Sequence, residues 1–286
     1  MSDPQPQRTP RSLIVSFYGA YGRDAKGEPL GPVPVAALIT LLGEVGVDPP
    51  SVRSAVSRLK RRGLLVPART AAGAAGYALS ADARELLADG DRRIYGRPTP
   101  RAGDGWVLAV FSVPEEERHK RHLLRSRLAR LGFGTAAPGV WIAPGHLYEE
   151  TRHVLRRLQL DPYVDLFTGA HAGFAPTAEA VARWWDLPAL AARHRAFLDA
   201  QEPVLGRWSR RRNTEPRTAY RDYLMALDAW RLLPYADPGL PATLLPDDWP
   251  GGRGATVFGR LHRRLHAAGA EFVSEVLGER STPGAR

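Results

Sequence analysis

Residues 51–81 contain no aspartate or glutamate, although six arginines and lysines fall within them. When Pro49 onward is wound at 3.6 residues per turn, the apolar residues share one face: Val52, Ala55, Val56 and Leu59. The opposite face carries Arg53, Ser54, Ser57, Arg58 and Arg61. A helix of this kind is suited to packing on a core with its back and lying on a polyanion with its front.

The residues before this helix predict a helix-turn-helix. Residues 34–46 place apolar side chains at helical spacing, with Pro34 in the first turn and Gly46 at the end. The expected buried positions are Val35, Leu38, Ile39, Leu42 and Val45. The turn that follows is short, and either Asp48 or Ser51 can cap the next helix. Two helices joined by so tight a turn, the second with a basic outer face, are typical of this motif.

The flanking segments complete a winged helix-turn-helix domain over residues 11–96. Residues 11–22 predict a first helix, and 22–32 a loop. Residues 64–70 and 77–80 predict a β-hairpin, the wing, with a tip of alanine and glycine at 71–76. Residues 81–96 predict a connecting helix.

Arginine binds guanine bidentately in the major groove, so the outer face of the basic helix supplies the candidate base readers. These are Arg53, Ser54, Ser57, Arg58 and Arg61. The candidate phosphate contacts are Lys60, Arg62 and Arg69, together with Arg8 and Arg11 of a basic N-terminal arm. The arm is expected to be disordered over 1–10, as is the tail over 281–286.

The middle of the chain, residues 97–175, predicts a second domain. A buried strand is expected over 106–113, a helix over 115–132 and two short strands over 133–145. A helix over 146–160 and a strand over 163–173 follow. The order β-α-β-β-α-β is that of a ferredoxin-like domain, an architecture that hosts many functions.

Residues 176–280 predict a third, all-α domain. Helices are expected over 174–208, with a break at Leu187-Pro188, from 218 onward and over 252–278. The chain is thus an α+β multidomain protein. Two histidine pairs have spacings that can present two metal ligands: His119 with His122, and His262 with His266. No carboxylate completes a known metal signature beside either pair. We therefore interpret all four as surface histidines.

Composition restricts the partners and the compartment. The formal charge is +10 and the pI about 10.3, which favours an acidic partner, and the absence of cysteine excludes disulfides and thiolate chemistry. No apolar run approaches the ~20 residues of a membrane span, and the N-terminus lacks the apolar region of a signal peptide. We expect a soluble intracellular protein with no membrane partner and no cofactor.

Four separated blocks resemble the PaaX family, bacterial repressors of aromatic-acid catabolism. They are RSLIVSFYGAYG (11–22), VRSAVSRLKRRGLL (52–65), GDGWVLAVFSVPEEERHKRHLLRSRLARLGFG with GVWIAP (103–134 and 139–144), and YRDYLMALDAWRLLPYADPGLPATLLPDDWPG (220–251). The resemblance implies a winged helix, a central ferredoxin-like domain similar to that of a CRISPR-adaptation nuclease, and a helical C-terminal domain. The wing tip at 71–76 departs from the family in being richer in alanine and glycine and lacking polar readers.

The resemblance also implies a cytoplasmic bacterial protein that associates with the nucleoid when bound. It implies a homodimer on inverted-repeat DNA, released by phenylacetyl-CoA or another aromatic acyl-CoA. Such a ligand needs basic groups for its phosphates and an aromatic-lined pocket for its acyl end. A cleft between the central and C-terminal domains is the expected position. Candidate ligand residues are Trp184, Trp185, Arg210, Arg211, Arg212 and Tyr220.

Two alternatives remain open at this stage. A metal-dependent nuclease needs carboxylates near strand ends, and the central domain offers Asp104 and Asp165. A non-enzymatic module that binds RNA or a protein is the other. Competition between duplex DNA and RNA distinguishes this module from a DNA-binding regulator.

Overall fold

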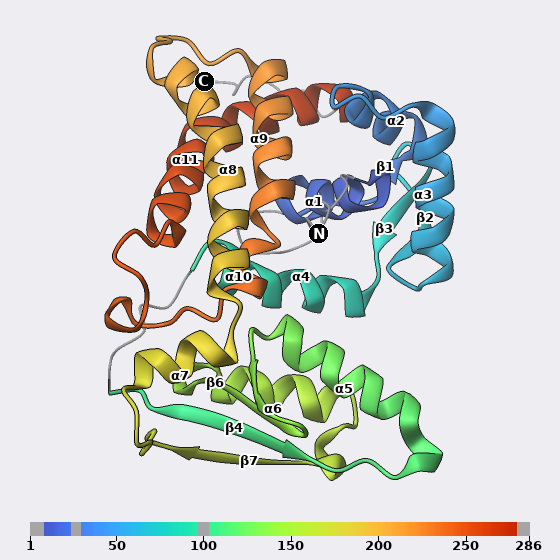
Figure 1. Cartoon of the computed structure of the whole chain (residues 1–286). Helices are drawn as coiled ribbons and strands as arrows, with labels where there is room; N and C mark the ends of the chain where they lie inside the picture. Colours follow the sequence, from blue (N-terminus) through green and yellow to red (C-terminus); the bar gives the residue numbers. More distant parts are fainter. Residues whose placement is uncertain (1–8, 24–29, 97–102, 279–286) are drawn as a thin grey trace, which may run out of the picture. The chain divides into compact units, whose positions relative to one another are not determined.

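Two units, each assembled from stretches far apart in the sequence, make up the chain in a computed structural model that describes residues 9–23, 30–96 and 103–278 (Figure 1). The first unit contains residues up to 95, 197–231 and those from 253 onward. The second contains 96–196 and 232–252. The first eight residues of the predicted arm, Arg8 included, and the tail at 281–286 lie outside the described residues.

The N-terminal part of the first unit follows the predicted order of elements, with one addition. It comprises α1 (Pro10–Tyr21), β1 (Val33–Pro34), α2 (Val35–Gly43), α3 (Pro49–Arg61), β2 (Leu65–Arg69), β3 (Ala75–Leu79) and α4 (Ala81–Ile94). The addition is β1, which pairs with β3 and gives a three-stranded antiparallel sheet in the order β1-β3-β2. A Cβ on Gly76 would lie 2.6 Å from the carbonyl oxygen of Val33, so glycine is what allows β1 to approach β3.

The buried face of α2 is shifted from the predicted one. Ala37, Leu38, Leu41 and Leu42 are buried, whereas Val35, Ile39 and Val45 are only partly buried. Helix α2 contacts both α1 and α3. The apolar residues that these two helices cover together differ from the single stripe that residue spacing predicts.

Three long helices complete the first unit. They are the second half of α8 (Leu187–Ser209), α9 (Pro216–Trp230) and α11 (Gly251–Leu277), and α9 contacts α1 (Figure 1). The expectation of one all-α domain over 176–280 therefore does not coincide with the units. Its later helices pack with the N-terminal elements, because the buried side chains of α9, such as Tyr223 and Leu224, belong to the same core as α1.

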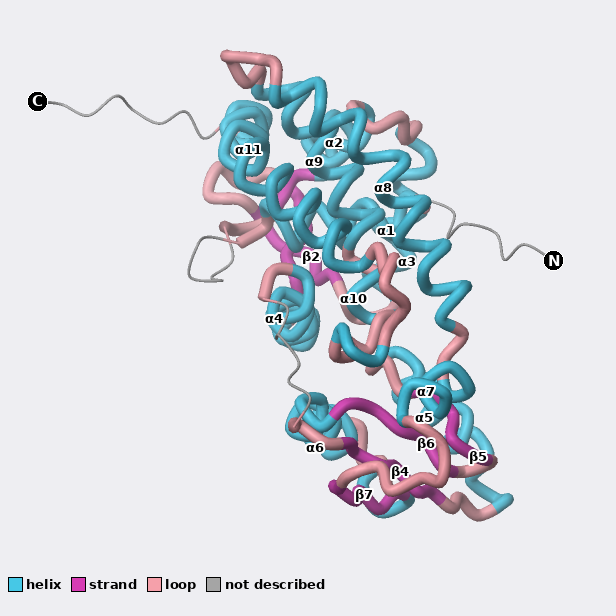
Figure 2. Tube along the Cα trace, turned by 60° about the vertical axis from the view of Figure 1, so that its left-hand side comes forward, coloured by secondary structure: helices cyan, strands magenta, loops and turns pink. Residues whose placement is uncertain are grey.

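The second unit has a four-stranded sheet and the predicted β-α-β-β-α-β order. Its elements are β4 (Trp106–Phe111), α5 (Arg118–Arg130), β5 (Gly134–Ala137), β6 (Val140–Pro144), α6 (Tyr148–Arg157) and β7 (Val164–Gly169). The strand order is β5-β6-β4-β7, and all neighbours are antiparallel. Figure 2 shows these strands as one sheet, whereas the first unit is mostly helical.

Both faces of this sheet bury apolar side chains. Val107 and Ala109 of β4 pack with Leu124 and Leu128 of α5, while Trp106 faces the other way. The second layer brings Trp106 and Ile142 together with residues of α7 (Thr177–Trp184) and the start of α8. The short elements of this unit are η1 (Glu115–Glu117), η2 (Gly145–Leu147), η3 (Asp161–Tyr163), α10 (Leu233–Ala236) and η4 (Ala242–Leu244).

The break predicted at Leu187-Pro188 lies two residues earlier. Helix α7 ends at Trp184 and α8 begins at Leu187, so Pro188 occupies the first turn of the new helix, where proline is tolerated. Asp186 stands before that turn and accepts a hydrogen bond from the backbone N–H of Ala189 at 2.9 Å. Within the described ranges, no helix is both long and apolar enough to cross a membrane.

Candidate functional site

Local hydrogen bonds determine where helix α3 begins and ends. Asp48 accepts a hydrogen bond from the backbone N–H of Ser51 at 2.9 Å, and hydrogen bonding to Ser51 lowers the pKa of the Asp48 carboxyl. At the other end Gly63 has a φ of 69°, its N–H donates to the carbonyl of Lys60, and Leu64 donates to Leu59. These two bonds form a Schellman motif, which stops the helix and turns the chain into β2.

The two faces of α3 lie as the residue spacing predicts. Val52, Ala55, Val56 and Leu59 are at most 3% exposed. The exposed residues are Arg53, Ser54, Ser57, Arg58, Lys60, Arg61 and Arg62. Arg58 donates through Nη2 to the Ser54 hydroxyl at 2.9 Å, so its guanidinium is held along the helix surface. No basic residue of α3 pairs with a carboxylate in the part of the chain that the structure describes.

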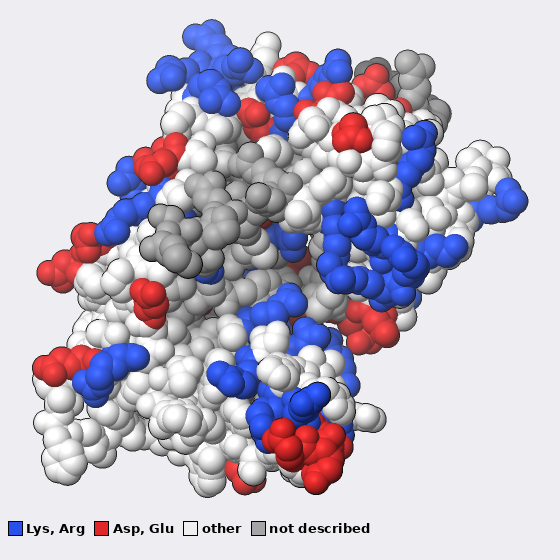
Figure 3. All heavy atoms as spheres, turned by 45° about the vertical axis from the view of Figure 1, so that its right-hand side comes forward, with Lys and Arg blue, Asp and Glu red and all other residues white. Residues whose placement is uncertain are grey.

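Positive charge therefore collects over α3 without neutralisation. In Figure 3 the side of the first unit that carries α3 comes forward, and lysine and arginine side chains gather over it. Unpaired guanidinium and ammonium groups on one helix are free to bind phosphate oxygens or base edges. The face is a candidate anion-binding surface on a helix.

The β2–β3 hairpin stands next to this helix in the chain and is closed at its tip. Arg69 Nη1 donates to the carbonyl of Gly73 at 2.8 Å, and Thr70 accepts from the N–H of Ala74 at 3.1 Å. Gly73 has a φ of 80°, a conformation that glycine adopts without strain. Arg69 thus organises the tip while its side chain stays on the surface. Arg11 is half-buried on α1.

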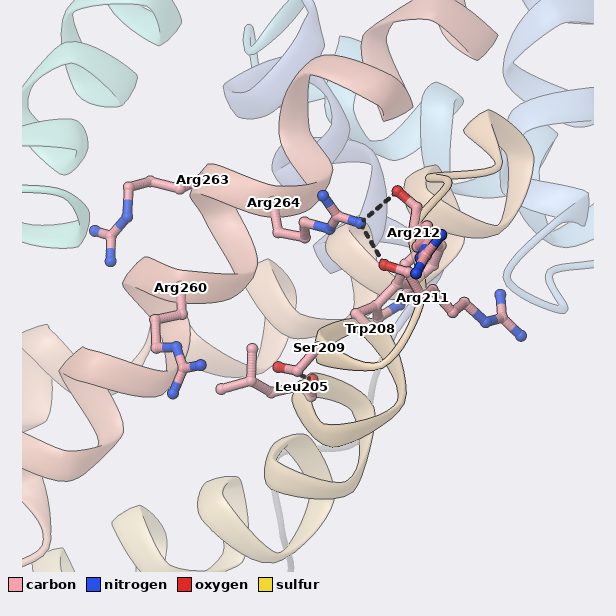
Figure 4. Close-up of a pocket in the computed structure, with 8 residues that line it drawn as sticks. All are labelled: Leu205, Trp208, Ser209, Arg211, Arg212, Arg260, Arg263 and Arg264. Atoms are coloured by element: carbon pink, nitrogen blue, oxygen red, sulfur yellow. Dashed lines mark hydrogen bonds between the residues drawn. The ribbon is translucent and has the colours of Figure 1, made fainter.

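Arginine also surrounds a pocket of about 550 Å³ on the first unit (Figure 4). The lining residues are Leu205, Trp208, Ser209, Arg211, Arg212, Arg260, Arg263 and Arg264. Arg264 Nη2 donates to the carbonyls of Arg211 and Arg212, at 2.8 and 3.3 Å, and the Arg211 guanidinium lies 5.1 Å from the centre of the Trp208 ring. We call this the arginine pocket. No acidic residue lines it.

The predicted ligand residues lie in three places. Arg211 and Arg212 line the arginine pocket, whereas Arg210 is exposed but does not. Tyr220 is fully buried in α9, with its ring 5.6 Å from that of Tyr21. Trp184 and Trp185 belong to the second unit, where Trp185 Nε1 donates to the carbonyl of Gly132 at 2.9 Å.

Residue spacing did not reveal the other half of the arginine pocket. Arg260, Arg263 and Arg264 come from α11 and stand opposite its buried Leu261 and Leu265. Their i, i+3, i+4 spacing is the signal that sequence alone offers. It marks a basic helix face but not the loop that this face meets.

The acids that a nuclease would need are not brought together. Asp104 precedes β4 at the end where Trp106 pairs with Gly169, whereas Asp165 stands opposite Val110, four residues further along β4. At about 3.3 Å per residue, this places them more than ~13 Å apart along the strand.

The interpretation of His262 and His266 on α11 as surface histidines is wrong, because both are partly buried and have partners within the protein. His262 Nδ1 lies 2.8 Å from the Tyr223 hydroxyl, and His266 Nε2 lies 2.9 Å from the carbonyl oxygen of Ala20. Among the described residues, no group of three or more His, Asp or Glu side chains is placed to hold a metal ion.

Comparison with known proteins assigns all three regions to one family. Residues 9–83 match the family description "PaaX-like protein", 99–181 match "PaaX protein central Cas2-like domain", and 185–275 match "PaaX-like protein C-terminal domain". The chain is 26% identical over 284 residues to the Escherichia coli protein named Transcriptional repressor PaaX, covering 96% of this chain and 87% of that one.

A solved structure supports the fold. The uncharacterized protein Rv0674 from Mycobacterium tuberculosis is 23% identical, has a TM-score of 0.52, and matches over 91% of this chain and 98% of its own. The three family matches follow one another along the chain, and the four sequence blocks that resemble the family occur in the same order. The chain therefore belongs to the PaaX family, a family of regulators rather than enzymes.

Proposed function

We propose that this protein is a DNA-binding transcriptional repressor, and that α1–α4 with β1–β3 form a winged helix-turn-helix. The observation that carries the proposal is the outer face of α3, which is exposed, acid-free and without carboxylate partners in the described chain. The similarity to a protein named Transcriptional repressor PaaX supports the same function. In this proposal α3 enters the major groove, and the β2–β3 hairpin is the wing.

The residues divide into base readers and phosphate contacts. Arg53, Ser54, Ser57, Arg58 and Arg61 face outward along α3 and read bases. Arg58 is already held by Ser54, which lowers the entropy lost when it meets a guanine. Lys60, Arg62, Arg69, Arg11 and Arg8 contact phosphates and set the register of the protein on the duplex.

Repression requires two such helices and a means of release. A homodimer presents two copies of α3 to an inverted repeat, with half-sites separated by whole helical turns. An acyl-CoA, with phenylacetyl-CoA as the first candidate, lowers DNA affinity if it binds more tightly to a conformer in which the two helices no longer match the half-sites. A ligand with equal affinity for both conformers changes nothing.

The test is a competition assay with the full-length protein. A labelled genomic duplex that the protein selects is displaced by unlabelled duplex of the same sequence, by shuffled duplex or by RNA of the same length. We expect only the first to compete at low concentration. Equal displacement by RNA would identify an RNA-binding module instead. Removing Lys60 or Arg62 should lower the slope of log K against log salt by about 0.9 for each phosphate that the variant no longer neutralises.

A further inference from the structure

We propose that the arginine pocket binds the phosphate groups of a small phosphorylated molecule. This proposal rests on the proposed function only where it gives the phosphorylated molecule a regulatory role. The binding of that molecule does not depend on DNA. The pocket lies wholly within the first unit, between the end of α8, the loop that follows it and α11.

The chemistry of the lining selects for anions. Five arginines line one hollow, and its lining includes no carboxylate. The carboxylate of Asp222 does not line the pocket; it accepts a hydrogen bond from Nε1 of the lining residue Trp208 at 2.8 Å and lies 3.5 Å from Arg207. Like charges gathered in this way repel one another, and a bound di- or triphosphate would relieve the repulsion while accepting bidentate hydrogen bonds.

The arrangement of the arginines leaves donors free for a ligand. Arg264 is occupied in part, because it holds the carbonyls of Arg211 and Arg212 and so fixes the loop that forms one wall. Arg260 lies opposite Leu205 and Ser209 in Figure 4, while Arg263 extends away from the other side chains drawn. Neither Arg260 nor Arg263 has a hydrogen bond or ion pair within the described residues.

The size and position of the pocket favour a small molecule over DNA. A volume of about 550 Å³ lies in the range typical of small-molecule sites, ~300–1,000 Å³. Figure 1 shows α8 and α3 on opposite sides of the first unit, with α9 and α1 between them. A duplex held by α3 is therefore on the other side of the unit from the pocket.

The wall of the pocket leads directly into the helix-turn-helix. The loop that carries Arg211 and Arg212 ends at Glu215, whose carboxylate caps α9 by accepting from the N–H groups of Arg217 and Thr218. The Arg217 guanidinium then makes a bidentate pair with Glu44, at 2.6 and 2.7 Å, in the turn between α2 and α3. A ligand that draws the loop toward α11 displaces the start of α9 and, through this pair, the turn before α3.

The direct test is isothermal titration of the full-length protein with inorganic pyrophosphate at fixed ionic strength. The test variant is Arg260→Ala/Arg263→Ala, which removes two side chains that make no hydrogen bond or ion pair within the described residues. The matched control is Arg84→Ala/Arg125→Ala, which removes the same charge from exposed positions outside the pocket. We expect pyrophosphate to bind the wild type and the control within a factor of two, and the test variant at least tenfold more weakly.

Three results would overturn the proposal. The first is no binding of pyrophosphate to the wild type, and the second is an equal loss in the control, which would mean a response to net charge alone. The third is a test variant that keeps pyrophosphate affinity, which would place the anion site outside the arginine pocket. Because the titration contains no DNA, a failure of α3 to bind DNA would leave its outcome unchanged and is detected separately.

Discussion

The hydroxyl of Ser16 on α1 donates a buried hydrogen bond to Oδ1 of Asp228 on α9, at 2.8 Å. Ser12 donates to the same oxygen at 2.5 Å, and Arg231 reaches both Asp228 and Ser12. The first helix of the proposed DNA-binding region and a helix from the C-terminal third are thus joined by a buried polar network. Contacts like this hold the proposed helix-turn-helix and the arginine pocket in one unit.

Ser16→Ala should lower the free energy of unfolding by about 1–3 kcal/mol, because it leaves a buried carboxylate with one donor fewer. Urea unfolding measures this value. The control is Ser126→Ala on the exposed face of α5, which should change stability by less than about 0.5 kcal/mol. If Ser16→Ala proved as silent as the control, the network would not hold α1 to α9.

Gly63→Ala should destabilise the protein by about 1 kcal/mol and weaken DNA binding, because alanine is strained at a φ of 69° and the Schellman motif sets where α3 ends.

Gly43→Ala should have the opposite effect on stability. A Cβ at Gly43 meets nothing within 4 Å and the residue ends α2 in helical conformation, so this substitution should stabilise by up to about 1 kcal/mol. Thermal unfolding of the pair checks both signs, and a stabilised Gly63→Ala protein would contradict the account.

The order and type of the elements could be predicted from the sequence, because glycine, proline and hydrophobic spacing act locally. Asp48, Gly46 and Gly63 mark the ends of α2 and α3, and the apolar back of α3 follows from its period. Strand β1 could not be predicted because two residues, Val33 and Pro34, carry no period of their own. Its pairing depends on Gly76, more than 40 residues away.

The grouping of the helices and the pocket could not be predicted, since both depend on long-range packing. Nothing in the local sequence of α9 says that Asp228 meets Ser16. Charge alone makes Arg211 and Arg212 candidate phosphate partners, and they line the pocket only because α11 brings Arg260, Arg263 and Arg264 alongside. Aromatic character places Trp184 and Trp185 among the same candidates, but their neighbours are Trp106 and Ile142 of the central sheet.

Acid should weaken the first unit through His262. Burial, reinforced by electrostatic interaction with His266 and Arg263, lowers the pKa of His262 from 6.5 to about 4. The unfolded chain takes up a proton near pH 6.5 that the folded chain excludes until pH 4, so the contribution of His262 is complete above pH 6.5 and is lost as the pH falls toward 4.

Urea unfolding at several pH values across this window tests the effect of His262. His262→Asn removes the titrating group beside the hydroxyls of Tyr223 and Tyr95 and should flatten the slope between pH 6.5 and 4 relative to the wild type. Wild-type and variant slopes that coincide would show that other groups cause the acid sensitivity.

Glu44→Gln should separate ligand binding from its effect on DNA. The substitution removes the charge that pairs with Arg217 but leaves the arginine pocket intact. Pyrophosphate affinity should stay within a factor of two of the wild type, while the change that pyrophosphate causes in DNA affinity should shrink. The exchange Glu44→Arg/Arg217→Glu restores opposite charges and should recover part of that change. An undiminished effect in Glu44→Gln would exclude this pair as the connection.

Selection of genomic DNA fragments by the wild type and by Arg58→Ala, followed by binding isotherms on the selected site, tests the central claim most directly. The wild type should enrich a set of fragments that share an inverted repeat. Arg58→Ala should bind the site more weakly by about 1–3 kcal/mol and accept substitutions at one position in each half-site. Arg84→Ala, on the exposed surface of α4, should behave as the wild type. Equal loss of affinity for all sequences in Arg58→Ala, or no enrichment by the wild type, would contradict the assignment of α3 as the helix that reads DNA.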